Sequence, residues 1–261
     1  RFWSNRYVVA RKGLWNSSPS RGIACPSGGS EGLSKSSAVN VSHKHTMISY
    51  DKRCIFIHIP KCGGTSIENI IWPHPEDRIE SNLWMGFISE FHNKYQTGGL
   101  QHLLARQIRN EVGLGVFESF YKFAIVRNPW DRIVSQFAYM QSRPDLMNFV
   151  GMQPKTEFKN YLRLIKKRQH VQWKPQLDFI LDDDGTLLVD RICRLECLEN
   201  DLNEIFDVLG VCRDRDKTTH ANRSKRESID HYYPDQESIE MVRDIYSKDI
   251  KFLNYSFDLM P

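Results

Sequence analysis

The hydrophobic positions of this chain form short apolar runs that alternate with longer segments of helical spacing. The first run, residues 54–59, reads Cys-Ile-Phe-Ile-His-Ile. A nearly continuous apolar and β-branched run of this length is typical of a strand buried on both faces. A Gly-rich loop follows, and Ile67, Ile70 and Ile71 then recur at helical spacing until Pro73 ends the pattern. This part of the chain therefore predicts a strand, a loop and a helix in succession.

A second unit of the same kind begins at residue 121. Residues 121–127, Tyr-Lys-Phe-Ala-Ile-Val-Arg, again favour a strand. Asn128 suits the N-cap and Pro129 the first position of the helix that follows, whose apolar face starts at Trp130. Both loops lie at the carboxyl ends of their strands.

The remaining pattern supplies the other elements of an α/β fold. Leucine and isoleucine spacing predicts an amphipathic helix over 100–112 that ends at Gly113. Two apolar runs around the turn at 182–185 predict a hairpin or strand pair over 179–189. Further helices are predicted at 157–168, 199–209 and 236–249. Strands interleaved with helices indicate a mainly parallel sheet, and ligands of such sheets bind beyond the carboxyl ends of the strands.

Charge and composition divide the chain near residue 46. The net charge is +4, but residues 1–46 hold seven Lys and Arg against one Glu, so they carry +6 and the rest carries −2. This removes the case for nucleic acid as a partner. Residues 1–46 also contain ten Ser and five Gly, which predicts a disordered leader, with an organelle transit peptide as the alternative. Residues 47–261 are predicted to form one domain, and no apolar run is long enough to span a bilayer.

The six cysteines favour no disulfide framework and no metal site. They show neither paired CxxC spacing nor the density of a disulfide-rich scaffold, so we interpret them as small buried hydrophobic residues. Cys193 and Cys197 stand four apart, but no His lies at zinc spacing from them.

The loop at residues 60–66, Pro-Lys-Cys-Gly-Gly-Thr-Ser, has the composition of a phosphate site. Consecutive glycines let the backbone approach an anion closely, and the start of a helix favours negative charge. Lys61 adds a positive charge, and Thr65 and Ser66 add hydroxyl donors. The motif GxxxxGK[ST] of nucleoside triphosphate loops is absent, because Lys61 precedes the glycines. The alternative for Gly63 and Gly64 is a plain strand-to-helix turn.

The second loop offers a second anion site. Arg127 ends the strand and Ser135 lies two helical turns into the next helix, so both side chains could face one phosphate. Arg132 is interpreted as covering the helix surface, with phosphate binding as the alternative.

Together these two motifs resemble a known family. Residues 58–66, His-Ile-Pro-Lys-Cys-Gly-Gly-Thr-Ser, and residues 126–135, Val-Arg-Asn-Pro-Trp-Asp-Arg-Ile-Val-Ser, look like the paired signature of sulfotransferases related to heparan and chondroitin sulfate sulfotransferases. The similarity covers about residues 50–258 and includes His-Ala-Asn-Arg-Ser at 220–224. It implies a P-loop-like, three-layer α/β fold that uses 3′-phosphoadenosine 5′-phosphosulfate (PAPS) without a metal.

The resemblance also implies roles for individual residues. The expected contacts of the 5′-phosphosulfate are Lys61, Gly63, Gly64, Thr65 and Ser66, and those of the 3′-phosphate are Arg127 and Ser135. The basic stretch that includes Arg223 and Ser224 either closes over the nucleotide or is a solvated charge run. The commoner family loop has Thr where this chain has Cys62, which removes a possible hydroxyl donor and puts affinity in doubt.

Transfer of a sulfuryl group to an acceptor hydroxyl needs a base that takes the hydroxyl proton. His102 is the candidate for this base. Histidine has a pKa close to neutral pH. We expect His102 in the first turn of the 100–112 helix, where the positive helix start would keep its imidazole neutral. The resemblance supports a catalytic His between the two phosphate motifs. A surface His bonded to the helix end is the alternative, with His92, Glu90 and Glu111 as other bases, whereas His58 is expected in the core.

The acceptor and the compartment follow from the resemblance alone. It favours a hydroxyl of a glycan or glycolipid as acceptor. It implies the cytoplasm for a bacterial member, and the Golgi lumen or membrane for an animal member with an N-terminal anchor. Two other functions stay open: a catalytically silent nucleotide-binding module, and a P-loop small-molecule kinase, which the position of Lys61 disfavours.

Overall fold

The computed structural model describes residues 47–71, 86–87, 100–211 and 227–259. Its central sheet has the order β1-β2-β5-β6, made of Ile48–Ser49, Cys54–Ile57, Tyr121–Val126 and Arg191–Arg194. Strands β2, β5 and β6 are parallel and β1 is antiparallel to β2. In register, Cys54 pairs with Tyr121 and Phe123 with Arg191. The predicted α/β fold with a mainly parallel sheet is therefore confirmed.

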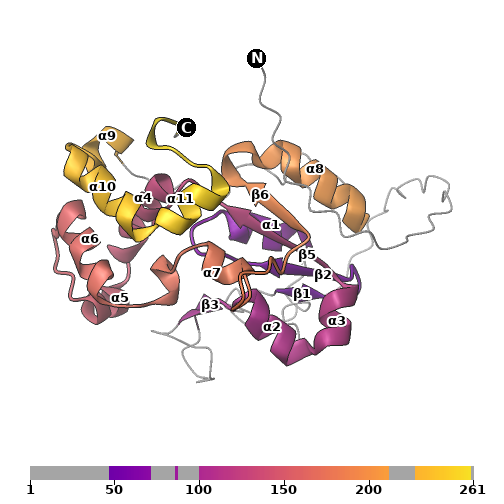
Figure 1. The fold of residues 1–261 in the computed structure, drawn as a ribbon. Helices are drawn as coiled ribbons and strands as arrows, with labels where there is room; N and C mark the ends of the chain where they lie inside the picture. The colour runs from indigo at the N-terminus through magenta and orange to yellow at the C-terminus, as the bar shows by residue number, and fades with distance from the viewer. Residues whose placement is uncertain (1–46, 72–85, 88–99, 212–226, 260–261) are drawn as a thin grey trace, which may run out of the picture.

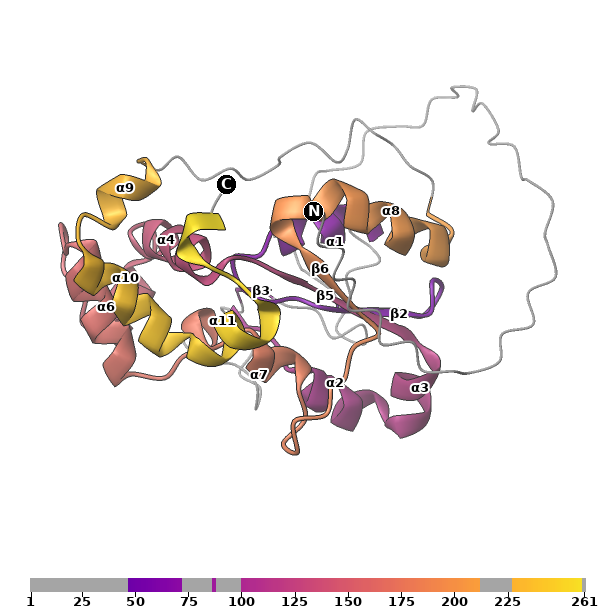
Figure 2. The ribbon, with the colours of Figure 1, turned by 45° about the horizontal axis from the view of Figure 1, so that its top comes forward.

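Helices cover both faces of this sheet. Figure 2 shows α1 (Gly64–Ile71) and α8 (Leu198–Leu209) on one side, and α2 (Ala105–Val112), α3 (Leu114–Ser119) and α7 (Leu177–Ile180) on the other. Every residue of β2 is buried, as is all of β5 after Tyr121, because apolar side chains on both strand faces meet a helical layer.

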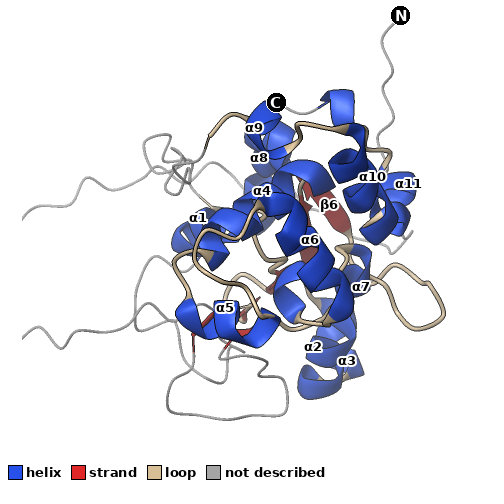
Figure 3. Cartoon of the chain, turned by 90° about the vertical axis from the view of Figure 1, so that its left-hand side faces the viewer, coloured by secondary structure: helices blue, strands red, loops and turns tan. Residues whose placement is uncertain are grey.

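A helical group stands at the carboxyl ends of the parallel strands (Figure 1). There α4 (Pro129–Met140), α6 (Phe158–Lys167) and α10 (Gln236–Ile245) pack against one another. Figure 3, viewed from that end, shows them in front of β6. The remaining elements are α5 (Pro144–Val150), α9 (Ile229–Tyr232), α11 (Ser247–Leu253), the pair β3 (Gly86–Phe87) and β4 (Leu100–Gln101), and 3-10 turns at Val171–Trp173, Leu195–Cys197 and Phe257–Leu259.

Two predicted helices have different bounds in the structure. The helix expected over 100–112 begins only at Ala105, because Leu100 and Gln101 form β4 and Leu104 has extended backbone angles. Its predicted end at Gly113 is confirmed, with the Gly113 amide bonded to the Arg109 carbonyl. The helix expected over 236–249 is broken at Tyr246 into α10 and α11.

The segment from 177 to 194 departs most from the prediction. The turn at residues 182–185 forms, with the Gly185 amide bonded to the Asp182 carbonyl at 3.0 Å. The flanking runs form no strands, since Phe179 and Ile180 are helical. They meet only at one antiparallel bridge, between Leu181 and Leu187, next to which the Leu188 amide donates to the Ile180 carbonyl at 2.8 Å. The sheet instead gains β6, which the pattern missed because only Cys193 in it is buried.

The four cysteines in the described part of the chain behave largely as predicted. Cys54, Cys62 and Cys193 are free and buried, whereas Cys197 is free and exposed. Burial raises the pKa of each of the three buried thiols to about 12, which keeps them protonated and apolar in character.

Candidate functional site

The loop after β2 is shaped by two residues with left-handed backbone. Lys61 has φ 66° and Gly63 has φ 79°. The loop then turns directly into α1, so the amides of Gly64 and Thr65 have no acceptor within the helix. Glycine takes such angles without strain, but Lys61 does not. The Lys61 carbonyl is held by the guanidinium of Arg127 at 3.1 Å, which stabilises this conformation.

A buried acid–imidazole pair lies under this loop. The His58 ring is buried, as expected, and its Nδ1 lies 2.6 Å from Oε1 of Glu68, a fully buried carboxylate on α1. A Cβ added to Gly64 would lie 2.5 Å from Nε2 and Cδ2 of that ring. The second glycine of the loop is therefore required by close packing on His58, in addition to any role in binding an anion.

We expect Gly64→Ala to lower both stability and nucleotide affinity. The new methyl group would push on a ring that Glu68 holds in place, and such overpacking costs about 1–3 kcal/mol. Gly115→Ala on α3 is the matched control, because nothing lies within 4 Å of its added Cβ. Urea unfolding and titration with adenosine 3′,5′-bisphosphate (PAP) measure the two effects. Equal results for the two variants would contradict the packing argument.

The second loop is fixed at the start of α4 as the sequence predicts. Asn128 is the N-cap, its side chain accepting from the Trp130 amide at 3.1 Å, and Pro129 follows at the first helical position. The backbone amide of Asn128 donates to Oε1 of Glu196 at 2.5 Å, and the side-chain amide of Asn128 donates to the Ser256 carbonyl at 2.9 Å. The C-terminal segment thus holds this loop in place.

Arg127 connects the two loops. Its Nε and Nη2 lie 2.7 and 2.6 Å from Oδ2 of Asp131, and its Nη1 donates to the Lys61 carbonyl. Ser135 lies one turn beyond Asp131 on α4 and is buried. The structure therefore brings Lys61 and Arg127 together, with Ser135 further along the helix that Arg127 precedes.

The side chain of Lys61 lies against α4. Its Nζ is 4.4 Å from the ring centroid of Tyr139, which follows Ser135 by one helical turn. Burial, and secondarily the positive charge of Arg127, lower the pKa of Lys61 to about 8. The ammonium group is thus poorly hydrated and close to its titration range, so a negative ligand would stabilise its charged form.

The interpretation of Arg132 as a surface residue is wrong. Its guanidinium is buried and donates to three backbone carbonyls, those of Pro60 at 2.9 Å, Lys174 at 3.0 Å and Gln172 at 3.4 Å. These carbonyls lie outside the α-helices and strands and need donors from elsewhere, so the buried guanidinium joins the first loop to residues 172–174.

His102 is not in the first turn of a helix, so the helix-start argument for its neutral form fails. It precedes Leu104, the N-cap of α2, and is half-buried. Its Nδ1 lies 3.3 Å from the His58 carbonyl and its Nε2 lies 3.0 Å from Nε2 of Gln172. A carbonyl only accepts and an amide nitrogen only donates, so Nδ1 carries the proton and Nε2 is the basic nitrogen.

Sequence reasoning missed two glutamines in this region. Gln172 contacts His102, and Gln176 contacts the first loop at Cys62 and the second loop at Arg127. The signal in the sequence was a glutamine next to an apolar residue, since Gln172 precedes Trp173 and Gln176 precedes Leu177. Such a pattern indicates a buried polar group but does not identify its partners.

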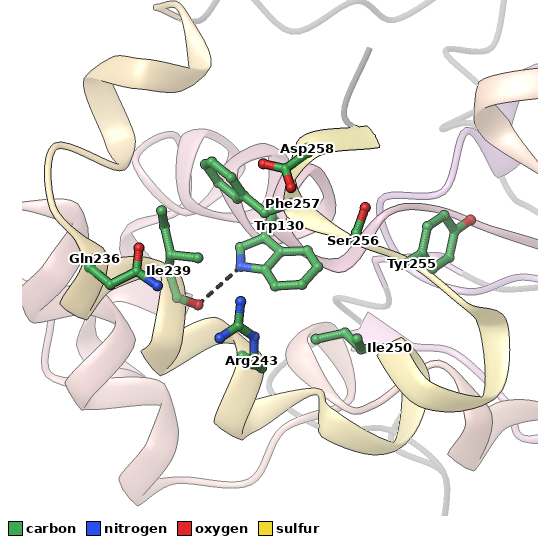
Figure 4. Close-up of a pocket in the computed structure, with 9 residues that line it drawn as sticks. All are labelled: Trp130, Gln236, Ile239, Arg243, Ile250, Tyr255, Ser256, Phe257 and Asp258. Atoms are coloured by element: carbon green, nitrogen blue, oxygen red, sulfur yellow. Dashed lines mark hydrogen bonds between the residues drawn. The ribbon is translucent and has the colours of Figure 1, made fainter.

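A cavity of about 330 Å³ lies between the start of α4, α10, α11 and the segment that follows α11 (Figure 4). Figure 4 shows Trp130 at its centre, with the indole N–H donating to the Ile239 carbonyl at 3.0 Å. Its lining consists of Trp130, Gln236, Ile239, Arg243, Ile250, Tyr255, Ser256, Phe257 and Asp258. None of the expected phosphate contacts among the described residues lines it, so we do not assign the donor to this cavity.

Several expected residues lie outside the described part of the chain. These are Arg223, Ser224, His92 and Glu90. Among the described residues, no group of three His, Cys, Asp or Glu is arranged to hold a metal ion. No helix in the same ranges is long and apolar enough to cross a membrane.

Comparison with known proteins adds one match. The model of a family described as "Sulfotransferase family" matches residues 44–256, which is most of the chain. Neither the curated proteins nor the solved structures give a significant match.

Proposed function

Because the chain belongs to the sulfotransferase family, and is therefore a sulfotransferase, we propose that it moves the sulfuryl group of PAPS to a carbohydrate hydroxyl by in-line transfer. This membership excludes the small-molecule kinase that the sequence left open. The observation that carries the rest of the proposal is the contact between the two loops, where Arg127 donates to the Lys61 carbonyl at 3.1 Å. It brings together two cationic residues at neighbouring strand ends, as a ligand with two phosphate groups requires.

On the donor side, the loop after β2 binds the 5′-phosphosulfate. The amides at the start of α1 and the hydroxyls of Thr65 and Ser66 donate to its oxygens. Arg127 and Ser135 bind the 3′-phosphate, for which Arg127 gives up part of its pairing with Asp131. Arg223 and Ser224 remain candidates for closing over the nucleotide.

The chemical step needs one proton acceptor and one group that follows charge onto the leaving phosphate. The acceptor oxygen forms a bond to sulfur while the bond between sulfur and the bridging oxygen breaks, and the bisphosphate PAP leaves. Lys61 neutralises the charge that develops on the bridging oxygen. Nε2 of His102 takes the hydroxyl proton, which requires the hydroxyl to displace the Gln172 amide from that nitrogen.

A screen with ³⁵S-labelled PAPS tests the acceptor class. We expect label in a polysaccharide or a glycolipid and none in simple phenols, measured in parallel without added metal and with a chelator. Transfer to phenols alone would overturn the carbohydrate assignment. Binding of PAP without transfer to any of the three classes would instead identify a silent nucleotide-binding module.

A further inference from the structure

Gln176 lies where the two phosphate loops meet, and its backbone is fixed from α11. It is the residue before α7 and is 0% exposed. The backbone amide of Gln176 donates to Oδ2 of Asp249 at 2.7 Å, and the backbone amide of Leu177 donates to Oδ1 of Asp249 at 3.0 Å. Asp249 thus caps α7 and holds Gln176 in one position.

The side chain of Gln176 uses both ends of its carboxamide. Oε1 accepts from the Arg127 amide at 2.8 Å, and Nε2 donates to the Arg127 carbonyl at 2.9 Å. One side chain thereby pairs with both backbone groups of Arg127, as a neighbouring strand would. This pairing fixes the backbone of Arg127 directly after β5, and with it the direction of the Arg127 side chain.

The same oxygen also reaches the first loop. The Cys62 thiol donates to Oε1 of Gln176 at 3.3 Å and is fully buried. The side chain at position 62 therefore points into the protein. The residue in place of the commoner Thr thus contacts Gln176, which also pairs with Arg127 of the second loop.

We propose that Gln176 is a positioning residue that couples the two phosphate loops, so that the enzyme prefers nucleotides carrying both a 3′- and a 5′-phosphate. This inference rests on the proposed function, because it assumes that each loop binds one end of PAPS. A phosphate bound at the second loop fixes Arg127 in place, and one bound at the first loop fixes Cys62. Gln176 contacts both residues, so fixing one of them also fixes the other loop. Coupling between two sites is typically worth a factor of about 5 to 150 in affinity.

Calorimetric titration with three probes tests the coupling: PAP, adenosine 5′-monophosphate and adenosine 3′-monophosphate. In Gln176→Met we expect affinity for PAP to fall by about 5- to 150-fold while affinities for the two monophosphates change little. A purely structural role would lower all three by the same factor, and that result would overturn the inference.

Gln136 supplies the matched control. It is 1% exposed on α4, and neither its amide nitrogen nor its oxygen has a hydrogen-bond partner among the described residues. Gln136→Met removes the same atoms as Gln176→Met without removing a contact between the loops. It should keep the wild-type preference for PAP, and a loss equal to that of Gln176→Met would contradict the coupling.

A second pair of variants keeps the test decisive if Gln176→Met does not fold. Cys62→Ser retains a donor to Gln176, whereas Cys62→Ala removes it. We expect the serine variant to keep more of the preference for PAP than the alanine variant, and identical preferences would overturn the inference. A wild-type protein that does not bind PAP would instead refute the proposed function.

Discussion

Replacing Lys61 by alanine is expected to lower kcat/KM for PAPS by about 10²- to 10³-fold, the usual cost of removing one group that stabilises transition-state charge. The ammonium group is poorly solvated in the free protein, where it lies over the Tyr139 ring, so little water competes for it. Transfer from labelled PAPS measures the loss, and thermal unfolding checks that the fold survives.

Lys155 is the control for this substitution. It is an exposed lysine whose φ of 67° matches the 66° of Lys61, so Lys155→Ala changes the same residue type in the same backbone conformation. We expect wild-type transfer from this variant. Wild-type turnover in Lys61→Ala would refute the assignment of Lys61 to the leaving group.

The pH dependence of nucleotide binding gives a second readout of Lys61. Its pKa in the free protein is lowered to about 8, so the charged form disappears as the pH rises through 8. Affinity for PAP should therefore fall above pH 8 in the wild type. Lys61→Arg keeps its charge throughout this range and should lose that dependence. An unchanged pH profile in Lys61→Arg would mean that another group causes the fall.

The two strand–loop–helix units could be predicted from the sequence because their signals are local. An apolar run gives each strand, and Gly63–Gly64 or Asn128–Pro129 marks each transition within a few residues. The predicted start of the helix before Gly113 lies too early in the sequence, because Leu103 and Leu104 fit the helical spacing but precede the helix. Both are buried, and Leu104 is the N-cap with extended backbone angles. Periodicity over so few positions does not fix where a helix begins.

The connections between the loops could not be predicted, because they join residues far apart in sequence. The sequence pattern favours a surface position for Arg132, because the three carbonyls that accept from its guanidinium are far from it in the sequence. Gln176 is 49 positions from Arg127 and 114 from Cys62, and no local pattern links them. Strand β6 forms because it can pair with β5 and not because of its own apolar content.

His102→Gln is expected to lower kcat by about 10²- to 10⁴-fold, the usual contribution of general acid–base catalysis. The contacts of His102, and not the start of a helix, favour this role. The His58 carbonyl accepts from Nδ1, which leaves Nε2 to take the proton of the acceptor. A glutamine has no comparable basic nitrogen.

The kinetic pattern separates a base from a residue that only supports the fold. The wild-type kcat should fall at low pH as Nε2 becomes protonated. His102→Gln should lose this fall of kcat at low pH while its affinity for PAP stays unchanged. His231→Gln, at an exposed histidine on α9, is the control and should keep both the wild-type rate and the fall of kcat at low pH. If His102→Gln turns over at the wild-type rate, the base must be sought at Glu111 on α2, or at His92 or Glu90. If instead its affinity for PAP falls together with the rate, the contact between His102 and the His58 carbonyl matters for the phosphate loop and not for proton transfer.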